Sequence, residues 1–238
     1  MAKQFVRLII GSAVFAALVG AAYLWLMSRQ TVAEGAPQVP VPFGYKTAWY
    51  AVHTDDAQEV ASALHLSDIH PSDWDAGTKA AVDWNAGQVF VTPPVRGWVL
   101  VEGAVLFSDT DRDRRFQNRL VTLSDQFGEA QYFASMRVSD AYTWARAKGG
   151  YLDCMFEWAD GQLSRQGNAK QVEEQAGLQY FDAASPAAKD PGYYKRNDLA
   201  YPNEEDVLRV ATAWSLNPMK METYPEAAVL GYVGRYHP

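Results

Sequence analysis

The sequence is poor in cysteine, and this excludes one common way of holding a fold together. Its 238 residues contain a single cysteine, Cys154, so no disulfide within the chain can form. Cys154 lies in the run "YLDCMFEWA", whose strand-like composition predicts a small buried hydrophobe rather than a reactive thiol. The fold must therefore be stabilised by packing.

Motifs of common catalytic sites are also missing. The chain has no GxSxG nucleophile elbow, no GxxxxGK[ST] phosphate loop and no GxGxxG dinucleotide fingerprint. Two of its four histidines lie close together in "HLSDIHPSDWD", where His65, Asp68 and His70 combine imidazole and carboxylate groups of the kind that bind zinc. Because Pro71 interrupts a helix there and no HExxH motif accompanies them, we interpret these residues as a solvated loop. A metal site remains the alternative, and no cofactor is expected.

Basic residues are outnumbered, with 21 Lys and Arg against 28 Asp and Glu. Three of the basic residues, Lys3, Arg7 and Arg29, lie in the first thirty positions, which hold no acid. The remainder has 18 basic against 28 acidic residues, a net charge of −10. Such a charge disfavours nucleic acid and favours a basic protein partner. Solubility alone is the alternative role.

One long apolar run is present, from Leu8 to Met27, and its twenty uncharged residues match the length of a membrane-spanning helix. The basic residues before it place the N-terminus inside the cell. We therefore expect a cytoplasmic stub and anchor over residues 1–30, in the inner membrane, with the rest of the chain in the periplasm or outside the cell. A cleaved signal peptide is the alternative.

The remainder divides into a linker and a domain. Residues 31–44, "TVAEGAPQVPVPFG", contain three prolines and two glycines, which predicts an extended tether. Residues 45–238 are expected to form an exported α+β domain with a mixed or antiparallel sheet.

The first half of this domain predicts the order β, α, β, β, α, β, with a further short helix around Trp74. A helix capped by Thr54 or Asp55 follows the first strand, and Pro93-Pro94 connects a buried hairpin. Phe116, Leu120, Leu123 and Phe127 have helical spacing, and Gly128 ends that helix. This order suggests the split βαβ arrangement of ferredoxin-like domains.

The second half predicts an added α/β-hairpin section. We expect a short helix over "SDAYTWARAKGG", a hairpin turning at Asp160-Gly161 and a helix in "NAKQVEEQAGL". Residues 182–202 should be irregular, and "NEEDVLRVATAWSLNP" should form a helix capped by Asn203.

Four strings, "VFVTPPVRGWVLVEG", "LSDQFGEAQYFASMRVSDAYTWARAKGG", "FEWADGQLSRQG" and "EEDVLRVATAWSLNP", resemble those of an uncharacterised bacterial family of exported or anchored α+β proteins. The resemblance covers roughly residues 45–220. Some members lie near toxin genes, so it implies immunity, and it assigns no catalytic residue.

Together these features predict a non-enzymatic, membrane-anchored immunity protein that neutralises a basic toxin by contact. The charged residues expected at the contact are Asp109, Asp111, Asp113, Glu204, Glu205 and Asp206. One alternative is an envelope metal-dependent hydrolase centred on His65, Asp68 and His70. Another is an assembly factor of an envelope complex, whose transmembrane helix itself makes contacts.

Overall fold

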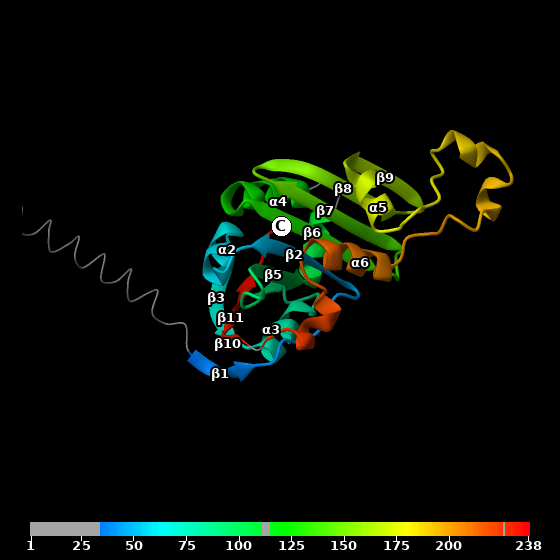
Figure 1. Cartoon of the computed structure of the whole chain (residues 1–238). Helices are drawn as coiled ribbons and strands as arrows, with labels where there is room; N and C mark the ends of the chain where they lie inside the picture. Colours follow the sequence, from blue (N-terminus) through cyan, green and yellow to red (C-terminus); the bar gives the residue numbers. More distant parts are fainter. Residues whose placement is uncertain (1–33, 111–114, 226) are drawn as a thin grey trace, which may run out of the picture. The chain divides into compact units, whose positions relative to one another are not determined.

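The computed structural model describes residues 34–110, 115–225 and 227–238 (Figure 1). Residues 35–238 form one compact unit, a mixed α+β domain with a large antiparallel sheet. The anchor expected over residues 1–30 lies outside the described residues. Within the described ranges, no helix is both long and apolar enough to cross a membrane.

The elements occur in the following order along the chain: β1 (Glu34–Gln38), β2 (Thr47–His53), α2 (Ala57–Ala63), β3 (Ser67–Ser72), α3 (Trp74–Ala81), β4 (Gln88–Val91), β5 (Trp98–Gly103), the 3₁₀ helix η1 (Ala104–Thr110), α4 (Arg115–Phe127), β6 (Glu129–Met136), β7 (Ala141–Lys148), β8 (Tyr151–Ala159), β9 (Gln162–Gly167), α5 (Ala169–Gln175), the 3₁₀ helices η2 (Pro186–Lys189) and η3 (Tyr193–Lys195), α6 (Glu204–Trp214), the 3₁₀ helix η4 (Pro218–Thr223), β10 (Ala227–Val229) and β11 (Gly231–Arg235).

Nine of the described strands form one sheet in the order β3-β11-β4-β5-β2-β6-β7-β8-β9, and β1 pairs with β10 separately. The predicted order of elements is present as β2, α2, β4, β5, α4 and β6, with β3 and α3 inserted. In the sheet, β5 separates β2 from β4, and β2 separates β5 from β6. The connection through α2, β3 and α3 and the connection through α4 therefore each join two strands that have one other strand between them, as split βαβ units do.

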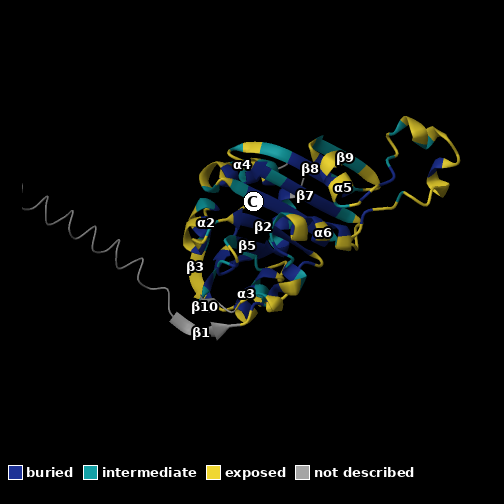
Figure 2. Cartoon of the chain, in the orientation of Figure 1, coloured by how far each residue is buried: buried dark blue, intermediate teal, exposed yellow. Residues whose placement is uncertain are grey.

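Helices cover both faces of this sheet. Successive side chains of a strand point to opposite faces, so Tyr50 packs in the cluster that includes α2 and α4. Its neighbour Trp49 packs in the cluster that includes α3, α5 and α6. Figure 2 shows the central strands as buried and much of the 182–202 segment as exposed. The domain thus has three layers, with a core on each side of the sheet.

One row of side chains on the second face runs directly across seven strands. The residues opposite one another in register are Phe90, Glu102, Trp49, Phe133, Trp144, Phe156 and Arg165. The rings of Trp49 and Phe133 stack at 5.1 Å between centroids, and those of Trp144 and Phe156 at 3.7 Å. The four adjacent rings of this row, from Trp49 to Phe156, bury much apolar area, which stabilises the core without a disulfide.

Both predicted hairpins are confirmed. β4 and β5 pair antiparallel, with Val91 opposite Val101, and Pro93-Pro94 lies in their connection. β8 and β9 pair around Asp160 and Gly161, whose φ angles of 52° and 72° are the left-handed values that a two-residue turn requires.

The helix predicted over "SDAYTWARAKGG" is wrong, because this segment contains strand β7. β7 lies between β6 and β8 and forms ladders with both. Trp144 packs on one face of the sheet and Ala145 on the other. Pairing on two sides and burial on two faces outweigh the modest helix preference of the alanines, Arg146 and Lys148.

Two smaller predictions also need correction. The expected loop around His70 contains the edge strand β3, which pairs with β11; Pro71 is tolerated because an edge strand leaves one side unpaired. The N-cap of α2 is Asp56, one residue after Asp55, and its carboxylate accepts a hydrogen bond from the Glu59 backbone at 2.8 Å.

The linker predicted over residues 31–44 is only in part an extended tether. The compact unit begins at Gly35, and β1 pairs with β10. Phe43 is buried, its ring lies 6.0 Å from that of Trp49, and its backbone N–H donates to the Pro218 carbonyl at 3.1 Å. The aromatic ring draws the end of the segment onto the domain, since its burial removes apolar surface from water.

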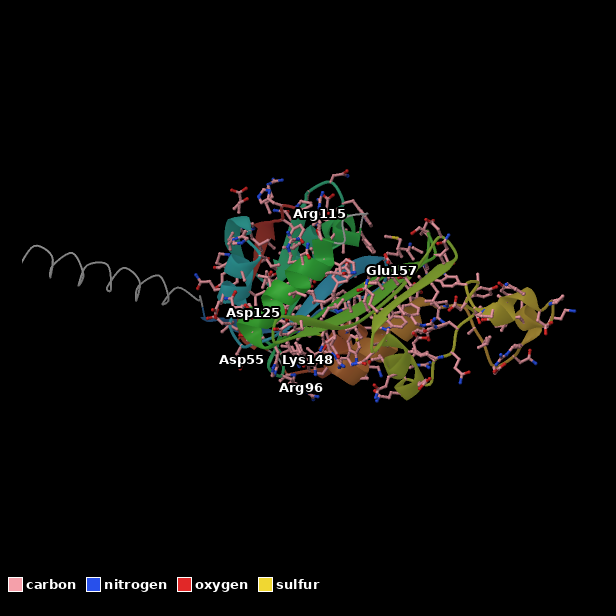
Figure 3. The ribbon with its side chains drawn as sticks, turned by 90° about the horizontal axis from the view of Figure 1, so that it is seen from above. Asp55, Arg96, Arg115, Asp125, Lys148 and Glu157 are labelled. Carbon is pink, nitrogen blue, oxygen red and sulfur yellow. The ribbon has the colours of Figure 1, made fainter. Side chains whose placement is uncertain are left out.

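The long helix α4 carries charged residues at both ends. Figure 3 shows Arg115 at one end, Asp125 near the other, and Glu157 of β8 on the side of Arg115. The predicted apolar spacing is confirmed, because Phe116, Leu120 and Leu123 are buried against the sheet.

Candidate functional site

Asp109, expected at an exposed contact surface, is instead completely buried. Its carboxylate accepts hydrogen bonds from Arg119 at 2.8 Å, from the Tyr50 hydroxyl at 2.9 Å and from the Tyr236 hydroxyl. Burial raises the pKa of Asp109, and the Arg119 guanidinium opposes that rise. The prediction is wrong because η1 turns the aspartate inward against β2. Asp111 and Asp113 lie outside the described residues.

Arg119 extends this network to the end of the chain. Its guanidinium lies 4.5 Å from the centroid of the Tyr236 ring and donates to the His237 carbonyl at 3.2 Å. The network thereby fastens the residues after β11 to α4. We assign it a structural role.

The three acids at the start of α6 have different surroundings. Asn203 forms a capping box with Asp206, and Asp206 is buried, so this residue is not a contact residue as predicted. Glu205 is exposed and accepts a 2.5 Å hydrogen bond from the Tyr45 hydroxyl, which raises the pKa of Tyr45 to about 12. Glu204 is paired with Arg137 at 3.3 Å. Of the three, Glu205 is exposed, whereas Glu204 is half-buried and lies at the surface only through its pair with Arg137.

The alternative metal site is not assembled. His65, Asp68 and His70 are exposed, Asp68 is paired with Arg235 at 3.5 Å, and His70 Nδ1 lies 3.1 Å from the Asp68 carbonyl oxygen. Throughout the part of the chain that the structure describes, no group of three His, Cys, Asp or Glu side chains is arranged to hold a metal ion.

A hollow of about 450 Å³ lies at one end of the sheet, between the 182–202 segment and the turns that join β6 to β7 and β8 to β9. We call it the aromatic hollow. Its lining residues are Asp140, Trp158, Gly161, Phe181, Ala183, Tyr194 and Tyr201.

Four rings wall the aromatic hollow at mutually inclined angles. Tyr201 lies 5.8 Å from Trp158 at 65° and 5.0 Å from Phe181 at 40°, measured between ring centroids and ring planes. Tyr194 lies 5.6 Å from Phe181. Trp158 and Phe181 are buried, whereas Tyr194 and Tyr201 are 49% and 55% exposed. About half of the surface of Tyr194 and of Tyr201 is therefore available to a ligand, whereas Trp158 and Phe181 form the buried part of the wall.

Asp140 shares the β6–β7 turn with Arg137, which is paired with Glu204 of α6 at 3.3 Å. Asp140 has a φ of 49°, and its carboxylate accepts a 3.0 Å hydrogen bond from the Trp158 indole. Burial raises the pKa of nearby Tyr142, and the charges of Asp140 and Glu204 raise it further. The carboxylates of Asp140 and Glu204 are therefore both close enough to Tyr142 to disfavour its ionisation. We call Asp140, Glu204 and Glu205 the acidic rim.

The segment that closes the aromatic hollow is held by an ion-pair network. Arg165 donates to both carboxylate oxygens of Glu173, at 2.7 and 2.8 Å, and to Asp182 at 3.1 Å. The Asp182 backbone N–H donates in turn to the Tyr193 hydroxyl at 2.8 Å. These contacts fix Phe181, next to Asp182, in the wall of the hollow.

The aromatic hollow was not predicted from the sequence. Tyr194 and Tyr201 lie in the Pro- and Gly-containing 182–202 segment, and aromatic residues in an irregular segment were the one available signal. Asp140 and Trp158 gave none, because they belong to a turn and a strand that look ordinary. A comparison with known protein families, curated proteins and solved structures finds no match for this chain.

Proposed function

We propose that this chain is a membrane-anchored periplasmic immunity protein that binds a basic toxin through the acidic rim. It neutralises the toxin by contact and performs no chemistry on it. The anchor, the outward orientation and the family resemblance come from the sequence. The observation that carries the proposal is the proximity of Asp140, Glu204 and Glu205 to exposed aromatic rings.

This combination suits a protein interface. Carboxylates at or near the surface attract a basic partner over several ångströms and raise its association rate, and of the rim residues Asp140 and Glu205 are exposed and Glu204 is half-buried. Tyrosine contributes a large contact area at low entropic cost, and Tyr45 and Tyr201 are 37% and 55% exposed beside these acids. The −10 charge of residues 31–238 acts in the same direction.

The test measures binding between the full-length chain in detergent and each purified protein encoded beside its gene. Surface plasmon resonance at low and high salt separates the electrostatic contribution, since screening weakens exposed charge pairs. We expect one neighbour to bind, with an association rate that falls as salt rises. The double variant Glu204→Gln/Glu205→Gln should lower that rate several-fold.

A matched control removes the same charge elsewhere. Asp55→Asn/Asp125→Asn changes two exposed acids, which lie at one end of the domain in Figure 3. It should leave the association rate nearly unchanged. The proposal is overturned if no neighbour binds, or if both double variants slow binding equally, because net charge rather than the rim would then be responsible.

A further inference from the structure

The aromatic hollow has a composition that favours one class of ligand. Of its lining residues, four are aromatic, and one, Asp140, carries a charge. The faces of aromatic rings are electron-rich, so they attract a cation placed over them, and a carboxylate at the wall adds to this attraction.

The geometry matches a compact cation better than a flat ligand. The planes of Trp158 and Tyr201 are inclined by 65°, and those of Phe181 and Tyr201 by 40°. Inclined rings surround a roughly spherical or short planar group on several sides, whereas a sugar ring prefers one broad flat platform with several polar groups at its edge.

The carboxylate in the wall is held in place. The β6–β7 turn places Asp140 in the left-handed region, and the indole of Trp158 donates to one carboxylate oxygen at 3.0 Å. Asp140 remains exposed, so a ligand in the hollow can reach its carboxylate. The same hydrogen bond orients the Trp158 side chain, so one contact positions both the charge and a ring.

Two nearby arginines already have partners. Arg137 of the same turn is paired with Glu204 at 3.3 Å, and Arg196 of the 182–202 segment is paired with Asp198. Neither lines the hollow. A cation that enters the hollow is therefore attracted by Asp140, the one charged residue among the described residues that line it.

We propose that the aromatic hollow is a binding site for a weakly hydrated organic cation, namely a guanidinium or an alkylated ammonium group. Such cations shed water at lower cost than a simple ammonium, which suits a site built of rings. The group can belong to an arginine side chain of a protein partner or to a free small molecule. The inference goes beyond the proposed function, because it requires no toxin.

The test titrates the full-length chain in detergent with small probes by saturation-transfer NMR. The cationic probes are N-acetyl-arginine methylamide and choline, and each is matched with a neutral molecule of similar shape, the citrulline derivative and 3,3-dimethylbutanol. We expect both cations to bind with millimolar affinity and the neutral molecules not to bind. Preference for the arginine derivative indicates a protein side chain as the source, and preference for choline indicates a small molecule.

Three variants and one control locate the site. Tyr194→Leu and Tyr201→Leu should each weaken cation binding about two- to fivefold, as expected for loss of one exposed cation–π contact. Asp140→Asn keeps the shape of the side chain and should weaken binding and remove most of its salt dependence. Tyr151→Leu, which removes a 79% exposed tyrosine from the other end of β8, should change nothing.

Three results overturn the inference. The neutral molecules could bind as well as the cations, methyl glucoside could bind better than either cation, or no cation could bind at tens of millimolar. Any of them would stand independently of the toxin-binding measurement, which uses different ligands and different variants.

Discussion

Arg119 and Asp109 form an ion pair at 2.8 Å in which the carboxylate is fully buried. Removing one partner of a buried pair leaves an uncompensated charge, which costs about 3–5 kcal/mol. We therefore expect Arg119→Met to lower the free energy of unfolding by an amount in this range, measured by urea denaturation. Tyr236→Phe, which removes one hydrogen bond to the same carboxylate, should cost about 1–3 kcal/mol.

Arg137→Met is the matched control for this pair. It breaks an ion pair whose arginine is 56% exposed, and such pairs contribute about 0–1 kcal/mol. Equal costs for Arg119→Met and Arg137→Met would show that the Asp109 network does not stabilise the domain.

Glu102 is buried beneath α3, between Phe90 and Trp49 in the row across the sheet, and burial raises its pKa from 4.5 to about 8. The nearby Thr78 hydroxyl opposes this rise in part. Between pH 4.5 and 8 the folded chain keeps a proton that the unfolded chain has lost, so stability falls as the pH rises through this window. At about 1.4 kcal/mol per pKa unit, the loss over these 3.5 units is on the order of 5 kcal/mol once the pH is above 8.

Glu102→Gln tests this assignment, because an amide cannot ionise. Relative to the unaltered protein, the variant should gain stability progressively between about pH 5 and about pH 8.5, measured by urea denaturation at several pH values. The exposed acid Glu222, changed to Gln, serves as the control and should leave the pH profile unchanged. A gain for Glu102→Gln that is the same at all pH values would contradict a buried, protonated carboxyl group.

Arg165→Lys should loosen the 182–202 segment while the rest of the domain stays folded. Lysine cannot reproduce the paired hydrogen bonds that the guanidinium makes to Glu173, and it reaches Asp182 less well. We expect faster amide exchange at Phe181 and Asp182 and earlier protease cleavage within 182–202. Arg196→Lys, at an exposed pair in the same segment, should leave exchange at those two amides as it is; comparable effects of the two variants would argue against the anchoring role of Arg165.

Cys154 should resist alkylation in the folded protein. The thiol is fully buried, and burial raises its pKa to about 12, so almost no reactive thiolate is present near neutral pH. Iodoacetamide labelling, followed by mass spectrometry, should be slow in buffer and complete in denaturant. Rapid labelling without denaturant would mean that β8 opens locally.

Elements with strong local signals were predictable from the sequence. The spacing of Phe116, Leu120 and Leu123 placed α4, and Asp160-Gly161 placed the turn between β8 and β9. Asn203 marked the start of α6. In each case the residues that cause the element to form lie close together in the sequence, within two turns of a helix or within one hairpin turn.

The segment around Trp144 shows where local signals fail. Its alanines and basic residues are compatible with a helix, yet the ladders with β6 and β8 make it a central strand. The prediction for Asp109 was wrong for the same reason. A charged residue followed by other charged residues is expected at the surface, but Asp109 is buried because Arg119 and two tyrosines from distant positions of the chain donate hydrogen bonds to it. Contacts with residues far away in the sequence therefore determine both the strand conformation around Trp144 and the burial of Asp109.

The sequence by itself determined the apolar N-terminal run, the excess of acid, the absence of a disulfide and the alternation of buried strands with amphipathic helices, because each follows from composition or short-range periodicity. Only the tertiary structure decided which charges are exposed and that Asp140, Trp158, Phe181, Tyr194 and Tyr201 line one hollow. These residues span 62 positions of the chain, from Asp140 to Tyr201, and no local pattern relates them. Pairing of the strands in the sheet brings Asp140 and Trp158 together. The hydrogen bonds of Arg165 to Glu173 and Asp182 hold the segment that carries the other rings beside them, because the buried carboxylate of Glu173 needs a charged partner.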